Sequence, residues 1–419
     1  MSRIIIQDGG IKGSNRMKIM NDSGNNQNAR RLKLMIGSNQ KIIVSVAGKT
    51  YESEDLGITY TELPATFPTI TAYNLNISTN NIFYAVTNAS IYNDSGTIRG
   101  TVYLALSEDS GNTWTRDVSL PFTPGSTSPG SFMWGSQDGK YLMASSCTYY
   151  IDGTVITSRN FGQDVSVNLS GASMRYTAGY VDKSGKNMII GGTGSETGIM
   201  QTKYSSDYGI TWNNFTQIPS GSPMGGAVVS GDGSRIVVWE QYHSSGNAVV
   251  YVSTDWTTWN STTVSQRMPA VGAISYDGKY ILIPSSDRSN APQPYLNLST
   301  NYGSTWTLKD VGYSQFWGGC AMSADGKYMI AYGGGGSSGG GYVVGYCYKS
   351  INYGATWSRI TELPASIYYD VAMSKSGKYV FVTDSSASHG GGVYRSDDYM
   401  NSWTHYFDGS TAAGIFINF

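Results

Sequence analysis

One short motif recurs along most of this chain. A clear copy reads Ser-Ser-Asp-Tyr-Gly-Ile-Thr-Trp, from Ser205 to Trp212, and related copies return every 46 to 54 residues. The eight copies begin at Ser53, Ser107, Ser158, Ser205, Ser253, Ser299, Ser350 and Ser396. A period in this range indicates a repeat protein, in which each unit completes the core of its neighbours.

The third position of the motif carries a carboxylate or an amide in every copy. We predict that this side chain accepts backbone N–H bonds within a tight turn, that the Gly adopts the left-handed conformation, and that the final aromatic residue packs between sheets. The third-position residues are Asp55, Asp109, Asn160, Asp207, Asp255, Asn301, Asn352 and Asp398. Their expected role is structural.

A second turn signal precedes each motif. Asp325-Gly326-Lys327 is typical, and it separates two apolar stretches. Asp-Gly between apolar stretches is the strongest short hairpin signal, because Gly supplies the positive φ that the turn needs. Each unit therefore reads as strand A, hairpin, strand B, loop, strand C, motif turn and strand D.

The predicted fold class is all-β. Roughly thirty short antiparallel strands in units of four indicate a β-propeller with four-stranded blades. Eight motifs favour eight blades, and seven is the alternative if a terminal unit is incomplete. The apolar tail, residues 412–419, resembles the start of a further A strand. We expect this tail to close the ring beside the first blade.

The repeated motif resembles the Asp box, or BNR repeat, of sialidase-like propellers, over roughly residues 30 to 408. The resemblance implies the fold and not one function, because Asp boxes occur in sialidases, in other glycosidases and in non-catalytic binding propellers. Sialidases carry an Arg-Ile-Pro motif, three substrate-binding arginines, a Tyr/Glu nucleophile pair and an Asp acid. This chain has no Arg-Ile-Pro and few glutamates. We therefore expect it not to be an enzyme.

One acid lies where sialidase-like chemistry would need it. Glu240 ends a B strand on the side opposite the motif turns, with Tyr242 beside it. A retaining glycosidase needs two such groups close together. The plainer interpretation is that Glu240 is a polar residue that closes a strand.

Composition argues against several other classes. The net charge of −1 provides no general attraction to nucleic acid or to an anionic membrane. The three cysteines (Cys147, Cys320 and Cys347) are too few for a disulfide framework, and no spacing of Cys and His suits a metal. No cofactor motif occurs. There is no signal-peptide core and no apolar stretch of membrane-spanning length, so we expect synthesis in the cytosol, without membrane insertion.

The first part of the chain differs in kind. We divide the sequence into a basic arm, residues 1–30, and the propeller, residues 31–419. Residues 1–33 contain seven Lys and Arg against two Asp, a local net charge of 7 − 2 = +5. This segment is either a disordered arm or a tether to an acidic partner, such as a particle or scaffold protein.

Ligand binding is expected on the face that bears the D–A and B–C loops. Residues just before the A strands converge there on the central funnel. The candidates are Arg175, Tyr176, Arg267, Phe316, Trp317, Tyr368, Tyr369 and Asp370. Exposed aromatic rings beside charged groups suit a carbohydrate or a protein surface. The alternative is that the aromatic side chains fill the channel of a wide propeller.

Composition and the missing catalytic set favour one function. The chain is expected to be a non-catalytic attachment or decoration protein of virion or phage type, displayed on a particle surface, that binds glycans or a cell-surface partner. Two alternatives remain open: a glycoside hydrolase or lyase of sialidase-like fold, and an intracellular protein–protein scaffold.

Overall fold

The chain divides into two compact units, Met1–Gln40 and Lys41–Phe419. In the first unit, β1 (Ile19–Met20) pairs antiparallel with β2 (Asn26–Gln27), and the rest of the predicted arm lies outside the described residues. The computed structural model describes residues 19–20, 26–27, 42–46, 49–63, 75–77, 83–92, 98–107, 115–120, 130–147, 154–169, 174–194, 201–218, 222, 224–240, 247–264, 272–285, 293–338, 341–386, 391–408 and 412–417.

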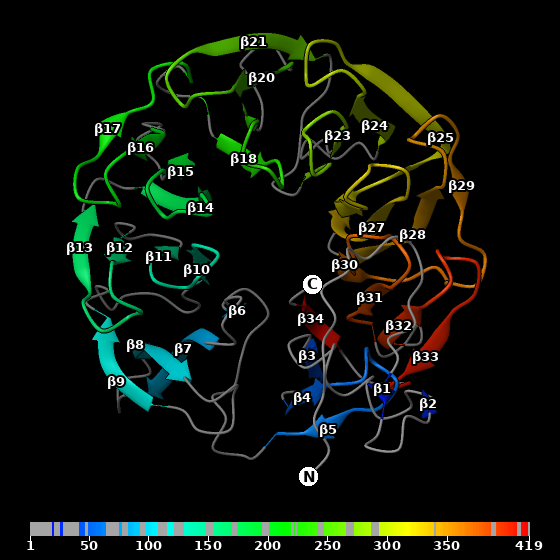
Figure 1. Cartoon of the computed structure of the whole chain (residues 1–419), viewed down its shortest axis with the longest axis horizontal. Helices are drawn as coiled ribbons and strands as arrows, with labels where there is room; N and C mark the ends of the chain where they lie inside the picture. The colour runs from blue at the N-terminus through cyan, green and yellow to red at the C-terminus, as the bar shows by residue number, and fades with distance from the viewer. Residues whose placement is uncertain are drawn as a thin grey trace. The chain divides into compact units, whose positions relative to one another are not determined.

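Within these described residues, the second unit contains eight four-stranded antiparallel sheets, which follow one another around a ring (Figure 1). We number these blades in the order of their motif turns. Blade 1 consists of β34 (Ala412–Ile417), β3 (Ile42–Val46), β4 (Lys49–Ser53) and β5 (Thr61–Glu62). Blade 2 consists of β6 (Leu75–Ile77), β7 (Phe83–Tyr92), β8 (Ile98–Ser107) and β9 (Thr115–Leu120). Blade 3 consists of β10 (Gly130–Gly135), β11 (Leu142–Cys147), β12 (Val155–Ser158) and β13 (Ser166–Leu169). Blade 4 consists of β14 (Met174–Val181), β15 (Met188–Gly194), β16 (Lys203–Ser205) and β17 (Asn213–Asn214).

The remaining blades repeat the same order of strands. Blade 5 consists of β18 (Met224–Val229), β19 (Ile236–Glu240), β20 (Ala248–Ser253) and β21 (Trp259–Val264), and blade 6 of β22 (Ala273–Ile274), β23 (Ile281–Pro284), β24 (Gln293–Ser299) and β25 (Thr307–Gln315). Blade 7 consists of β26 (Trp317–Met322), β27 (Met329–Ser338), β28 (Gly341–Ser350) and β29 (Ser358–Arg359). Blade 8 consists of β30 (Tyr368–Met373), β31 (Val380–Asp384), β32 (Gly392–Ser396) and β33 (Thr404–Tyr406). The predicted fold class is confirmed.

The two ends of the second unit meet in one sheet. The tail strand β34 pairs with β3, with Ile417 opposite Ile42, and so serves as strand A of blade 1. The neighbouring seam is tied by Arg395 of blade 8, whose Nε donates to the Leu56 carbonyl at 2.7 Å. The expectation that the tail closes the ring is therefore confirmed.

The core lies between neighbouring sheets. The B strands β19, β23 and β31 have every residue buried, because each lies against a blade on both of its faces. One cluster joins Ile189 of blade 4 to Met224 and Val238 of blade 5. The D strands lie outermost and are largely exposed, as in β21 and β25. No single blade thus has a core of its own.

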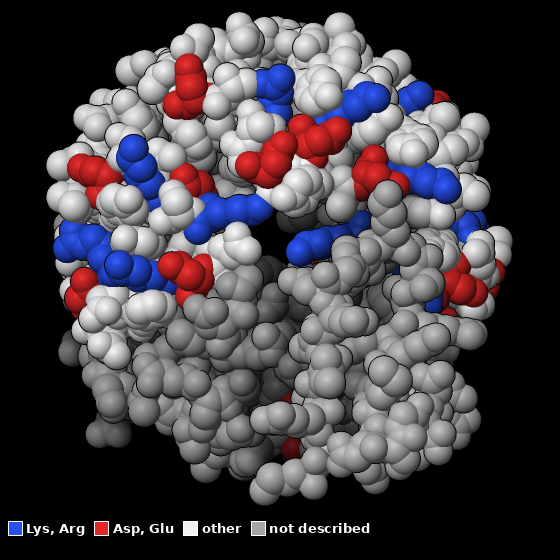
Figure 2. All heavy atoms as spheres, in the orientation of Figure 1, with Lys and Arg blue, Asp and Glu red and all other residues white. Residues whose placement is uncertain are grey.

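The A–B hairpins of blades 3 to 8 form as predicted and also join the blades. In the blade 7 hairpin, Asp325 Oδ1 accepts from Ser323 Oγ at 2.6 Å, and Gly326 has a φ of 73°. Successive hairpins share backbone hydrogen bonds: Tyr276 N donates to the Ala324 carbonyl at 2.7 Å, and Ala324 N donates to the Lys375 carbonyl at 2.7 Å. Figure 2 shows the face that carries these hairpins, where charged side chains lie above and on either side of a central opening.

The motif turns have the predicted hydrogen bonds. Ser205 Oγ donates to Asp207 Oδ1 at 2.8 Å and accepts from Gly209 N at 2.9 Å. The two Asp207 oxygens accept from the backbone and the hydroxyl of Thr211 at 2.9 and 2.6 Å. Burial opposes the charged form of Asp207, but these hydrogen bonds outweigh it and lower the pKa of the carboxyl. Asn301 accepts from Thr305 N in the same way. Asp109 lies outside the described residues.

Two consecutive residues of the turn are left-handed, and only the Gly was predicted to be so. The fourth residue of the motif, just before the Gly position, has a φ of 61° to 63° in Tyr208, Tyr353 and Tyr399. Their rings stack on tyrosines of the preceding blade: Tyr208 lies 4.6 Å from Tyr141. The backbone N–H of Tyr208 donates to the Lys186 carbonyl of its own A–B hairpin. This contact with two blades stabilises a conformation that otherwise costs about 1–3 kcal/mol.

The third motif turn departs from the prediction. Asn160 was expected to accept the backbone hydrogen bonds, but Asp164 does so instead, because its Oδ1 accepts from Ser158 Oγ, Arg159 N and Asn160 N at 2.7 to 2.8 Å. Asn160 Nδ2 donates to Gln163 at 3.3 Å, on the surface. The carboxylate of Asp164 shares the Ser158 hydroxyl donor with the other motif turns but takes different backbone N–H groups. The turn keeps its shape, because Gly162 N still donates to Ser158 Oγ at 2.8 Å and Gly162 has a φ of 80°.

We predict different effects for the two side chains of this turn. Asp164→Ala should lower the free energy of unfolding by about 1–2 kcal/mol, because three donors lose their acceptor. Asn160→Ala, the control, should change it by less than about 0.5 kcal/mol. Urea unfolding of both variants measures the difference. A larger loss in Asn160→Ala would contradict the assignment of Asp164.

Candidate functional site

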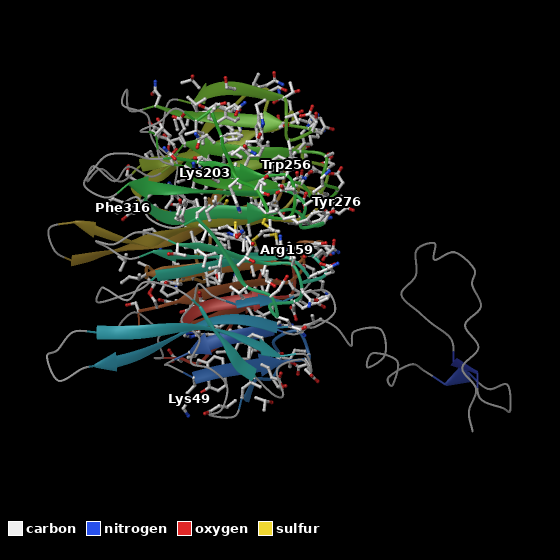
Figure 3. All side chains as sticks on the ribbon, turned by 90° about the vertical axis from the view of Figure 1, so that its left-hand side faces the viewer. Lys49, Arg159, Lys203, Trp256, Tyr276 and Phe316 are labelled. Carbon is white, nitrogen blue, oxygen red and sulfur yellow. The ribbon has the colours of Figure 1, made fainter. Side chains whose placement is uncertain are left out.

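The two faces of the second unit carry different connections. Figure 3 places Phe316, in a D–A loop, at one face, and Tyr276, in an A–B hairpin, at the opposite face. We call them the loop face and the turn face. Much of the loop face lies outside the described residues, but the D–A loops on either side of blade 7 are described.

Three of the predicted ligand-binding aromatic residues are buried. Tyr176, Trp317 and Tyr368 are 4%, 3% and 2% exposed, so the expectation that they face the funnel is wrong. Each lies just before a register shift in the pairing of its A and B strands, and Met224 holds the same place in blade 5. This position of the repeat packs between blades. Burial accordingly raises the pKa of Tyr176 to about 12.

The other candidates are placed differently. Phe316, Tyr369 and Asp370 are partly buried. The Tyr369 carbonyl accepts from the Tyr332 hydroxyl at 2.7 Å, and Asp370 Oδ1 accepts from the next backbone N–H at 2.8 Å. Arg175 lies in β14, but its side chain is outside the described part of the structure. Arg267 lies outside the described residues. Ligand binding by these residues stays a prediction.

Two fully buried acids end B strands on the loop-face side. Glu240 accepts from the Tyr251 hydroxyl at 2.6 Å, and Asp384 accepts from Ser366 Oγ at 2.7 Å and Ser386 N at 2.9 Å. They belong to blades 5 and 8 and therefore do not form a pair. Tyr242, the predicted neighbour of Glu240, lies outside the described residues.

Within the described ranges, no three His, Cys, Asp or Glu side chains gather as metal ligands. No helix long and apolar enough to cross a membrane occurs in that same part of the chain. Cys320 and Cys347 are buried thiols, and burial raises their pKa values.

An exposed aromatic and cationic cluster lies between blades 6 and 7. The guanidinium carbon of Arg359 lies 3.6 Å from the centre of the Tyr346 ring. Tyr313 meets the same ring edge-on at 4.9 Å and is 44% exposed. We name these three residues the Tyr313 cluster. Its sequence signal is weak, because the residues come from three different strands: the end of β25, β28 and β29.

A buried amide positions the cluster. Gln315 is 1% exposed, and its side chain donates to the Tyr346 carbonyl at 3.1 Å and accepts from Tyr346 N at 2.8 Å. Gly333 permits this approach, because a Cβ there would lie 2.3 Å from the Gln315 amide carbon. Gln315 thus joins the end of β25 to β28, two residues from Tyr313, and holds the two tyrosines together.

The cluster offers two kinds of contact to a ligand. The exposed Tyr313 ring provides a flat apolar face, and the exposed Arg359 provides N–H donors. Burial raises the pKa of the neighbouring Tyr348, and the charge of Arg359 opposes that rise. The cluster is three residues from Phe316 along the chain and so adjoins the loop face.

A shallow pocket of about 210 Å³ lies at the seam between blades 5 and 6. Its lining includes Thr262, Thr263, Asn297, Thr305 and Trp306 and contains no charged side chain. Hydroxyl groups and one indole wall suit an uncharged polar ligand. The volume accommodates only a small group, so we regard the Tyr313 cluster as the better candidate.

Comparison with known proteins supports the fold and no more. No family model and no curated protein matches the sequence. Dihydro-heme d1 dehydrogenase NirN matches with a TM-score of 0.58 at 11% identity, over 90% of this chain and 75% of that one. An oligogalacturonate lyase in complex with manganese matches with a TM-score of 0.50 at 11% identity, over 73% and 82%. A GH74 enzyme from Niastella koreensis matches with a TM-score of 0.49 at 17% identity, over 88% of this chain and 70% of that one. The first two of these neighbours are β-propeller proteins.

We predict that Gln315→Met destabilises the site. The variant keeps the volume but leaves the Tyr346 N–H and carbonyl without their partner, at a cost of about 1–3 kcal/mol in unfolding free energy. Gln163→Met, on an exposed motif turn, is the matched control and should change it by less than about 0.5 kcal/mol. Equal unfolding curves for the two variants would show that Gln315 does not hold the cluster.

Proposed function

We propose that this chain is a non-catalytic binding propeller that recognises a glycan through its loop face and the adjoining Tyr313 cluster. One observation carries the proposal: an exposed tyrosine and an exposed arginine are held in a fixed arrangement at the edge of that face. Binding sites place a few rigid aromatic and polar groups in this way, because less entropy is then lost on binding.

The finer role rests on composition. We propose an attachment or decoration protein displayed on a virion or a similar particle. The sequence is rich in Gly and Tyr, with only 14% charged residues. The recurring hydrogen bonds from Ser Oγ to Asp Oδ1 support the resemblance of the motif to an Asp box, for example at 2.8 Å in Ser53–Asp55.

A glycosidase of sialidase-like fold is the second candidate, and one contact favours it. The Tyr251 hydroxyl donates to Glu240 at 2.6 Å, which is the chemistry of a Tyr/Glu nucleophile pair. The two residues are 7% and 0% exposed, however, so a substrate cannot reach them without rearrangement of blade 5. This burial makes binding without turnover the preferred function.

We expect the intact protein to bind members of a glycan array and to release no product from the same glycans. The array and a reducing-end assay with bound polysaccharide, run on one preparation, measure the two properties. Tyr251→Phe is the control for hidden activity. Product release that disappears in this variant would replace the proposed function by the glycosidase.

A further inference from the structure

We propose that the Tyr313 cluster takes the anionic group of an acidic saccharide, a carboxylate or a sulfate, as a subsite of the proposed glycan-binding surface. Arg359 binds the two anionic oxygens, and Tyr313 packs against the sugar ring. The inference depends on the proposed function, since it names the chemical class of the ligand.

The stacking of Arg359 prepares it for this task. With its carbon 3.6 Å from the Tyr346 ring centre, the guanidinium lies directly against the ring. Such packing restricts the rotamers of a long side chain before the ligand arrives. The N–H groups lie in the plane of the guanidinium, so a ring below that plane leaves them open to a partner at its edge.

Other arginines of the chain show what a structural role looks like. Arg395 is 6% exposed, donates to the Leu56 carbonyl at 2.7 Å, and forms an ion pair with Asp397 at 3.1 Å. Arg359 is exposed, and among the described residues its side chain is held by the Tyr346 ring and not by a hydrogen bond or an ion pair. Arg359, unlike Arg395, is therefore placed to accept an external anion.

The geometry favours an oxyanion over a neutral hydroxyl. A guanidinium presents two parallel donors, which match the two oxygens of a carboxylate or sulfate. A single hydroxyl fills only one of them and carries no charge. Tyr313, at 44% exposure, adds an apolar face beside the anion site, as a saccharide ring requires. The net charge of −1 means that the attraction is local to this site.

The test is an array in which each acidic glycan is printed beside its carboxyl-reduced or desulfated counterpart. The tightest acidic oligosaccharide is then titrated against the wild-type protein and three variants. Arg359→Gln removes the charge, Arg359→Lys keeps the charge without the paired donors, and Tyr313→Ala removes the ring. Arg159→Gln, on a motif turn of the turn face, is the control with the same change of net charge.

Arg359→Gln should weaken binding of the acidic oligosaccharide roughly 10- to 100-fold, as expected for a charge-assisted pair. Arg359→Lys should lose less affinity than Arg359→Gln but should not reach the affinity of the wild type. Tyr313→Ala, as a separate variant, should also bind more weakly than the wild type. Arg159→Gln should bind like the wild type, and thermal melting should confirm that all variants are folded.

Each other outcome is decisive. Equal binding of neutral and acidic counterparts, or wild-type affinity in Arg359→Gln, would overturn the anion subsite and leave glycan binding intact. An array with no bound glycan of any charge would overturn the proposed function itself, and the subsite with it.

Discussion

Packing of each blade against both of its neighbours is the constraint on which the rest of this structure depends. A four-stranded sheet is too small to bury its own faces, so its B strand is buried by the blades on either side. The motif turns enforce this contact, because a left-handed tyrosine such as Tyr208 touches its own hairpin and the ring of the preceding blade. The β34–β3 pairing completes the circle.

This constraint also decides where function can lie. The beginnings of the A strands and the ends of the B strands belong to the seams between blades, which explains the burial of Trp317, Tyr368 and the acids Glu240 and Asp384. Side chains can vary freely only where an element extends beyond the common repeat. β25 does so, with nine residues where β17 and β29 have two, and the Tyr313 cluster lies at its end.

The sequence was sufficient for the fold and insufficient for the site. The period, the Asp-Gly hairpins and the tail predicted the blades and their closure, because these depend on local turn chemistry and apolar pattern. The exposure of Tyr176 was mispredicted, since a ring before a strand reads alike whether it faces a channel or a seam. Asp164 was missed because another position supplied the carboxylate. The Tyr313 cluster combines three strands, and no local pattern connects them.

The most direct measurement is a crystal structure of the protein with a bound acidic oligosaccharide. The account predicts an anionic group within hydrogen-bond distance of the Arg359 guanidinium and a sugar ring against Tyr313, with Glu240 and Asp384 still buried between blades. A ligand seated elsewhere, for example in the central opening, with no contact to Arg359, would contradict it. So would a sugar in contact with Glu240.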